Sequence, residues 1–392
     1  HEKTMSRFCT ENLLDSENHK FILRMTEMEC PKTVSNVTVV EGIRFIPPYY
    51  FQFCYDLKIV NLPESLYKIG DKAFYHCKSL ERINIPRKVV HIGESAFESC
   101  DNLQIVHLPP TLTEIRGRCF QYCGSLSKVV NTDALLKIGY RAFDRCRLLQ
   151  KINLESVKMF DNSAFYDCTN LQTVFLSNEI RSLSVSLFHS CEALEYVGPK
   201  PFTNECDEQK YNYDKYDKGI QEKLSKMGLC IPKIEYIMKN AFWYCKSLKN
   251  VFLTDGMVLE DLCFEACNGI EEISVPGDLI CTDFSKSSYF GKCKSMEFVK
   301  IRPIANKVNF EVVFEMLYHI VKKRPLIAAK PCMNDDVYPF EVAILWLVQN
   351  KNPFHFDKPT GNIDLHEFRS ACVTKSLYLF LRNNPMVLKK YI

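Results

Sequence analysis

One short pattern of hydrophobic and polar positions recurs along the chain between residues 51 and 293. In each copy a phenylalanine is followed three residues later by a cysteine, and three residues further on by leucine, isoleucine or methionine. Most copies begin 23 residues after the previous one, and a fixed period of this length is typical of a solenoid of stacked units. The anchors are Phe51/Cys54, Phe74/Cys77, Phe97/Cys100, Phe120/Cys123, Phe143/Cys146, Phe165/Cys168, Phe188/Cys191, Phe242/Cys245, Phe264/Cys267 and Phe290/Cys293.

A single unit is predicted to form a short strand, then a turn and a return segment. Leu80 to Pro86 alternates between inward and outward positions and stops at a residue without an N–H, which predicts a strand. Gly93 predicts a turn with positive φ, and Phe97 and Cys100 are expected to point inward on the return. A unit this small cannot bury its own apolar face, so stability comes from stacking neighbours. With strands about 4.8 Å apart, ten units give a solenoid on the order of 50 Å long.

The full consensus is Leu-x-x-Ile-x-Leu-Pro-x-x-Val-x-x-Ile-Gly-x-x-Ala-Phe-x-x-Cys. Over about residues 40–301 it resembles the BspA-like leucine-rich repeat family, because the commoner leucine-rich repeat classes lack Ala-Phe-x-x-Cys. The resemblance implies an α/β leucine-rich repeat solenoid of short parallel strands with about ten repeats, which binds a protein or surface ligand without catalysis. Arg116 and Phe160 depart from the Ile-Gly step. Phe290 stands 26 residues after Phe264, and degenerate last units are expected of a capping end.

The sequence changes character on both sides of the repeats. An amphipathic stretch from about Glu11 to Met28 is expected to cap the first unit. After about Ile304 the apolar positions follow a helical period, as in Phe310 to Val321, and this predicts a small α-helical C-terminal domain. The predicted regions are an N-terminal segment and cap at 1–39, the solenoid at 40–301 and the helical domain at 302–392.

The regular spacing is interrupted once, between Phe188 and Phe242, which lie 54 residues apart, one period of 23 plus 31 more. The extra segment lies at about 199–231 and begins with a charged, tyrosine-rich stretch. An insertion in a solenoid loops out on one face and often carries contacts. Tyr211, Tyr213 and Tyr216 are therefore candidate anchors for a partner, and a purely decorative loop is the alternative.

The outward strand positions, five and seven residues after each cysteine, are where a partner is expected to bind. The first half of this face carries basic residues and the second half aromatic ones, a composition found at binding surfaces. The alternative is that the aromatic rings cover one another or pack under the insertion. The candidates on the strands are Arg82, His107, Lys128, Lys151, Phe175, Tyr196, Phe252 and Phe298.

Charge and cysteine usage limit the partner and the compartment. Lys plus Arg number 50 against 47 Asp plus Glu, so no strong field favours nucleic acid or a membrane surface. No apolar run reaches the roughly 18–20 residues that a membrane span needs. Most of the 19 cysteines occupy repeat positions and are interpreted as reduced, buried residues, which favours an intracellular compartment. The sequon at Asn36 matters only in a secreted chain, an alternative that stays open.

Motifs for catalysis or metal binding do not stand out. The chain lacks a P-loop, a Gly-x-Ser-x-Gly elbow and His-Glu-x-x-His. Cys119 and Cys123, four residues apart, both fall on core repeat positions, so zinc is not predicted. The sequence ending at Glu367 echoes half of a calcium loop, but Phe356 and Lys358 supply no oxygen ligand. No catalytic, cofactor or metal residue is predicted.

The scattered histidines give no motif either. His76, His91 and His189 occupy variable repeat positions, so we expect them on the solvated surface.

These patterns favour a non-enzymatic protein–protein interaction scaffold or structural subunit of a larger complex. Its protein partner would bind through the strand face, the insertion or the helical tail. The first alternative is an extracellular or cell-surface adhesin-like or receptor-like protein built on the same repeats. A regulatory subunit that positions an enzyme is the second. The thiol state and a glycan at Asn36 distinguish a secreted chain from an intracellular one.

Overall fold

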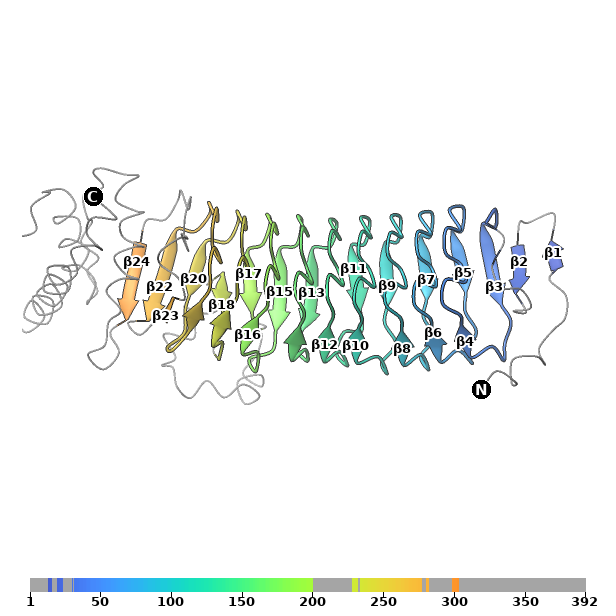
Figure 1. Cartoon of the computed structure of the whole chain (residues 1–392), viewed down its shortest axis with the longest axis horizontal. Helices are drawn as coiled ribbons and strands as arrows, with labels where there is room; N and C mark the ends of the chain where they lie inside the picture. The colour runs from blue at the N-terminus through green and yellow to red at the C-terminus, as the bar shows by residue number, and fades with distance from the viewer. Residues whose placement is uncertain are drawn as a thin grey trace, which may run out of the picture.

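In the computed structural model the units stack side by side into one elongated array (Figure 1). It describes residues 13–15, 20–23, 30, 32–199, 228–231, 233–276, 280–281 and 298–302. All regular elements in these ranges are β-strands. The solenoid prediction is confirmed, but the α/β class is wrong for the described units, because turns rather than helices return the chain. The predicted helical domain lies outside the described residues, apart from Arg302 at the end of a strand.

The front of the solenoid is a long sheet with one strand from each regular unit. It has two seven-stranded parts that meet between β11 and β13, and every neighbouring pair is parallel except β1 and β2. The predicted cap therefore contains an antiparallel strand pair, and β2 continues the sheet beyond β3. The strands are β1 (Leu13–Asp15), β2 (Lys20–Leu23), β3 (Asn36–Val39), β5 (Ile59–Asn61), β7 (Arg82–Asn84), β9 (Ile105–His107), β11 (Lys128–Val130), β13 (Lys151–Leu154), β15 (Thr173–Leu176), β17 (Tyr196–Gly198), β18 (Leu229–Cys230), β20 (Asn250–Phe252), β22 (Glu272–Pro276) and β24 (Phe298–Arg302).

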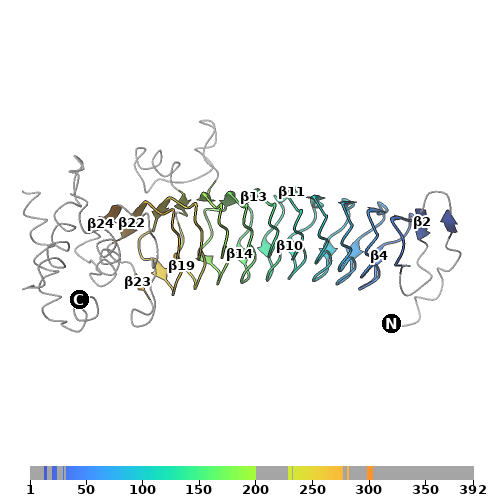
Figure 2. The ribbon, with the colours of Figure 1, turned by 90° about the horizontal axis from the view of Figure 1, so that it is seen from above.

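The back of the solenoid is built from two-residue strands, which Figure 2 shows as a second layer opposite the front sheet. Each back strand has the pattern of one outward and one buried residue wherever its side chains are described, as in Lys68 and Ile69. The strands are β4 (Phe45–Ile46), β6 (Lys68–Ile69), β8 (His91–Ile92), β10 (Glu114–Ile115), β12 (Lys137–Ile138), β14 (Met159–Phe160), β16 (Ser182–Leu183), β19 (Tyr236–Ile237), β21 (Val258–Leu259) and β23 (Ile280–Cys281).

A column of stacked phenylalanines fills the core between the two layers. The nine rings from Phe51 to Phe264 that begin the repeat motif are fully buried, and the centroids of neighbouring rings lie 4.9–5.7 Å apart. Offset stacking at this distance adds to the free energy gained by burying each ring. The column continues without a gap across the insertion, where Phe188 and Phe242 stack at 5.5 Å.

The repeat cysteines form a second column beside the rings. Each thiol from Cys77 to Cys267 donates a hydrogen bond to the carbonyl of the phenylalanine in the preceding unit; Cys100 Sγ lies 3.3 Å from Phe74 O. None of the twelve cysteines whose side chains are described forms a disulfide, and all are buried, which confirms the predicted unbonded column for its nine described members. Burial raises the pKa of the Cys100 thiol well above its usual value, so the thiol stays protonated and keeps donating.

Two residues in each return turn adopt the left-handed conformation, and neither is the predicted glycine. Ser95 and Ser99 have φ of 54° and 60°, and the equivalent positions of the other described units repeat this. Ser99 N–H then donates to Gln121 O of the next unit at 2.8 Å, so the strained turns allow hydrogen bonding between units. Gly93 has no positive φ; a Cβ there would lie 2.4 Å from the backbone nitrogen of Asp71. Close approach of the backbones therefore requires glycine.

The end of the insertion is part of the front sheet instead of a loop. β18 lies between β17 and β20 (Figure 1), while β16 and β19 pair directly on the back. Gly228 opens this strand, where a Cβ would lie 2.7 Å from Glu195 O and 2.9 Å from Asn250 O. The prediction of a loop over 199–231 is thus wrong for its last residues, which form a strand. Glycine is required just before this strand because a side chain would clash with both neighbouring backbones.

Candidate interaction surfaces

The front sheet carries an uncompensated basic surface between β5 and β13. Arg82, His107, Lys128 and Lys151 are exposed on successive strands, which confirms their predicted outward phase. None of the four forms an ion pair with a described residue, and none of the outward residues is a carboxylate. We name this surface the basic strip; it consists of Ile59, Asn61, Arg82, Asn84, Ile105, His107, Lys128, Val130, Lys151 and Asn153.

Two of the four aromatic candidates on the front face are buried. Phe175 and Phe252 are only 8% and 6% exposed, so their predicted exposure is wrong. Phe175 lies beside Gly198 on the next strand, and Tyr196 contacts its ring edge-on at a centroid distance of 6.2 Å. Lys151 Nζ lies 4.7 Å from the centroid of the same ring. Because Gly198 has no side chain, it leaves space beside the Phe175 ring. Tyr196 and Lys151 therefore cover this ring, as the alternative interpretation held.

Of the remaining aromatic candidates, only Tyr196 has a described side chain. Tyr196 is half-buried, and its O–H donates to Pro199 O at 2.5 Å. The side chain of Phe298 is outside the described residues, as are Tyr211, Tyr213 and Tyr216.

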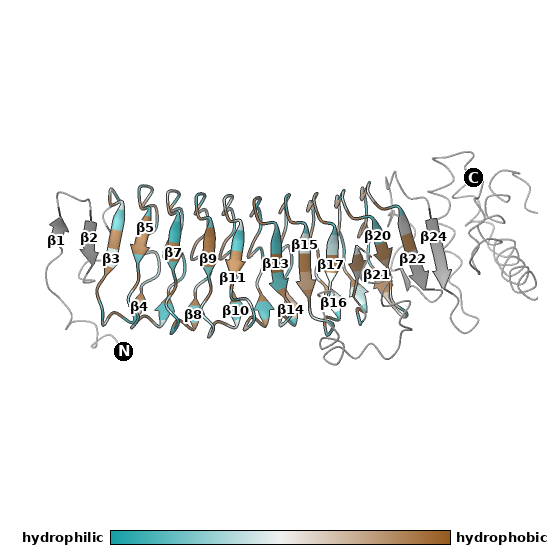
Figure 3. Cartoon of the chain, turned by 180° about the vertical axis from the view of Figure 1, so that it is seen from behind, coloured by the Kyte–Doolittle hydropathy of each residue, from teal (hydrophilic) through white to brown (hydrophobic). Residues whose placement is uncertain are grey.

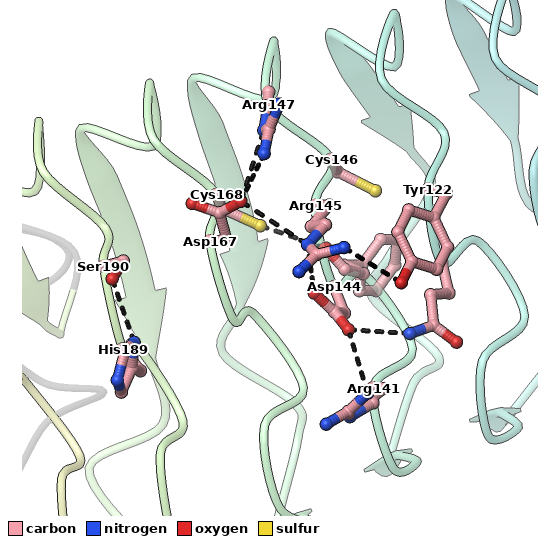
Figure 4. Close-up of polar contacts among 12 residues, drawn as sticks. Tyr122, Arg141, Asp144, Arg145, Cys146, Arg147, Asp167, Cys168, His189 and Ser190 are labelled. Atoms are coloured by element: carbon pink, nitrogen blue, oxygen red, sulfur yellow. Dashed lines mark hydrogen bonds and ion pairs between the residues drawn. The ribbon is translucent and has the colours of Figure 1, made fainter.

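A second charged region lies on the return turns and escaped prediction from the sequence. Figure 4 shows Arg141, Arg145 and Arg147 around Asp144 and Asp167, and we name these five residues the arginine network. Arg147 donates from Nη2 and Nε to Asp167 Oδ2, at 2.7 and 3.2 Å. Arg145 Nε lies 3.6 Å from the same oxygen, and Arg141 Nη1 lies 3.8 Å from Asp144 Oδ2. Each arginine is therefore partnered by a carboxylate.

Asp144 is the buried centre of the arginine network. Its side chain is 2% exposed, and Oδ2 accepts a hydrogen bond of 2.7 Å from the Gln121 amide. Burial raises the pKa of Asp144, while the hydrogen bond from Gln121 and the nearby arginines partly oppose this shift. Asp144 Oδ2 is thus a buried acceptor that the Gln121 amide and Arg141 share.

Tyr122 closes the arginine network on the side of the preceding unit. Arg145 Nη1 donates to its hydroxyl at 2.9 Å, and the guanidinium carbon lies 5.0 Å from the ring centroid. A cation over an aromatic face is held in place by the ring's electrostatics. Arg145 and Tyr122 occupy the same repeat position, two residues after phenylalanine, so this spacing was the signal that sequence reasoning could have used.

The comparisons with known proteins agree with the repeat geometry. The family model described as BspA type leucine rich repeat region, in six copies, matches residues 28–148, 106–213 and 222–316. These segments cover more than half of the chain. The chain belongs to this BspA type family. No match was found among curated proteins.

Several solved structures are similar to part of the chain. A leucine-rich repeat protein of Bacteroides ovatus is 22% identical and has a TM-score of 0.46; the match covers 73% of this chain and 83% of that one. The leucine-rich repeat protein of T. pallidum is 28% identical with a TM-score of 0.35, over 51% of this chain and 83% of that one. A leucine rich cell surface protein of Faecalibacterium prausnitzii is 19% identical with a TM-score of 0.31, over 75% and 93%.

One histidine of these BspA type repeats is buried, contrary to its predicted place on the surface. His189 stacks on Tyr166 at a centroid distance of 4.3 Å and meets Trp243 edge-on at 4.4 Å. Burial lowers its pKa to about 4. The neutral ring shares a hydrogen bond of 2.9 Å with the Ser190 hydroxyl through Nδ1 (Figure 4). This environment suits a packed structural residue.

The described residues also bear on metal and membrane binding. Within the described ranges, no group of three or more His, Cys, Asp or Glu side chains is arranged to hold a metal ion. No helix among the described residues is long and apolar enough to cross a membrane.

Proposed function

We propose that this BspA type repeat protein is a non-enzymatic protein-interaction module whose partner binds the front sheet at the basic strip. The observation that supports this most directly is that Arg82 and Lys128 have no ion pair with a described residue, on strands whose outward positions between β5 and β13 carry no carboxylate. Lys151 has no such ion pair either but contacts the Phe175 ring. Asp133, at the border of the strip, accepts a hydrogen bond from Asn153 at 3.5 Å. Several cations elsewhere in the described residues do form ion pairs, such as Lys137 with Glu114 at 3.2 Å. Charges of one sign fixed on a rigid sheet steer a complementary partner and select its orientation.

The rigidity of the face supports the same function. Outward residues of β5, β7, β9 and β11 stand in exact strand register, with Arg82 beside Ile59 and Ile105 beside Lys128. Their backbones are fixed by inter-unit hydrogen bonds on both faces of a continuous core. A prearranged surface loses little conformational entropy when it binds, so more of the contact energy remains as affinity.

Photo-crosslinking from two matched positions tests this function. Ile105 lies in the middle of the basic strip. Met159 is also an exposed aliphatic residue, but it lies on the back strand β14. A photoreactive phenylalanine analogue at Ile105 should form adducts with the native partner, and the same analogue at Met159 should not. Adducts formed at Met159 alone would place the partner on the back and refute the proposal.

The compartment and the other candidate contacts remain predictions. An intracellular compartment stays a prediction, as does a contact role for Phe298 and for the three tyrosines of the insertion. Phe175 and Phe252 are not proposed as contacts because they are buried.

A further inference from the structure

The basic strip has an ordered pattern along the solenoid axis. Its first row reads Ile59, Arg82, Ile105, Lys128, and each residue is in register with the next on the neighbouring strand. Ile59 and Ile105 are 46% and 40% exposed, which is high for branched aliphatic side chains in a repeat with a large core. Apolar and cationic side chains therefore alternate at steps of about 4.8 Å. Figure 3 shows the alternation as brown β5 and β9 beside teal β7.

A second row beside the first carries amide side chains. Asn61 and Asn84 are in register, and His107 follows them on β9. An amide offers two donors and an acceptor, so it can bond both the N–H and the C=O of a peptide group. The Asn61 amide nitrogen donates to Thr38 Oγ1 at 3.2 Å, and the residue is exposed. The second row thus matches a polypeptide backbone.

We propose that the occupant of the basic strip is a polypeptide segment rich in both acidic and aliphatic residues, lying across the strands. Its carboxylates pair with Arg82 and Lys128, and its aliphatic side chains contact Ile59 and Ile105. This inference rests on the proposed function and adds the chemistry of the partner. Arginine in particular gives two parallel hydrogen bonds to one carboxylate.

Other polyanions fit the strip less well. Single-stranded nucleic acids bind largely through Phe, Tyr and Trp side chains that stack on bases, and no outward residue of the basic strip is Phe, Tyr or Trp. Duplexes and sulfated polysaccharides offer no aliphatic groups to Ile59 and Ile105. The nearly balanced charge of the chain, 50 basic against 47 acidic residues, also favours a short local contact over a long polyanion.

Peptide selection tests the chemistry directly. The full chain is immobilised and panned against random displayed peptides of about twelve residues, with counter-selection on the Arg82→Ser/Lys128→Ser/Lys151→Ser variant. We expect enriched sequences with net negative charge and branched aliphatic residues. A labelled peptide from this set should lose about tenfold or more in affinity with Arg82→Ser, which corresponds to about 1.4 kcal/mol. Ile105→Ser should weaken it as well, whereas Met159→Ser on the back should not.

Three results would overturn the inference. These are selection of neutral or basic peptides, equal binding by the triple variant, and stronger displacement of the peptide by single-stranded DNA or a sulfated polysaccharide than by unlabelled peptide. The crosslink from Ile105 separates the two proposals. If Ile105 captures a native partner through a neutral segment, the interaction function stands and the acidic segment is wrong.

Discussion

The basic strip carries basic residues on successive units, whereas the arginine network carries three within one return turn, and only the second set is paired with carboxylates. In the arginine network, Asp144 and Asp167 occupy the turns beside Arg141, Arg145 and Arg147, and every guanidinium has a carboxylate within 4 Å. In the basic strip the neighbouring units contribute isoleucine, asparagine and valine instead. The repeat decides where a side chain points, and the equivalent residue of the next unit decides whether its charge is neutralised.

This difference separates structural charges from available ones. A buried carboxylate such as Asp144 needs its hydrogen-bond donors, so its neighbours contribute to the fold. Exposed, unpaired lysines contribute little to folding and retain their full field toward a partner.

The largest expected effect concerns the core beneath the arginine network. Phe143→Ala should lower the free energy of unfolding by about 3–5 kcal/mol, because it empties a buried site between Phe120 and Phe165. Urea denaturation followed by circular dichroism measures it, with the exposed Leu148→Ala as control. An unchanged midpoint for Phe143→Ala would show that the ring column does not carry the stability of the units.

A smaller loss is expected at the centre of the arginine network. Asp144→Ala should cost about 1–3 kcal/mol, because it leaves the buried Gln121 amide without an acceptor. Asp144→Asn keeps an accepting oxygen and should cost less, since burial already raises the pKa of the carboxyl. Thermal melts of both variants measure this difference. Equal losses would mean that the charge, rather than the hydrogen bond, stabilises the network.

Acidification should act on the turns near His189. Its folded-state pKa of about 4 lies below the ordinary value near 6.5, so the unfolded chain takes up the proton first. The contribution of His189 is therefore complete above about pH 6.5 and declines as the pH falls toward about 4, by at most about 1.4 kcal/mol per pH unit. Denaturant midpoints across this range should fall less steeply in His189→Gln. Identical slopes in the two proteins would refute burial of the neutral ring.

The smallest stability effect belongs to the basic strip. Arg82→Ser and Lys128→Ser should each change the free energy of unfolding by no more than about 0.5 kcal/mol, because neither side chain has an ion pair to lose. Differential scanning calorimetry suffices for this measurement. A loss near that of Asp144→Ala would reveal a structural role for these cations.

The periodic features of the fold were predictable because each unit packs equivalent residues at equivalent positions. Ring positions such as Phe97 and thiol positions such as Cys100 follow from the period, and the outward phase of Arg82 follows from strand alternation. These residues depend mainly on their own unit and its equivalents. One sequence window therefore contains the information that places them.

The features that were not predictable depend on pairs of residues in different units. Phe175 is buried because Gly198 leaves room beside it, and Gly93 is required by the backbone of Asp71. The entry of β18 depends on space between Glu195 and Asn250. In the arginine network, the pairing of Arg145 and Arg147 with Asp167 joins turns of neighbouring units and appears only once the units are stacked. No single window of sequence contains these contacts.

The most direct test removes the two sets of cations in separate variants and compares the two proteins. Arg82→Ser/Lys128→Ser/Lys151→Ser is compared with Arg141→Ser/Arg145→Ser/Arg147→Ser, and both stability and affinity for one selected peptide are measured on each protein. We expect the first variant to keep its melting temperature and lose at least about tenfold in affinity. The second should melt earlier and bind normally below its transition. Normal binding by the first variant, together with lost binding by the folded second one, would contradict the assignment of the basic strip as the interaction surface.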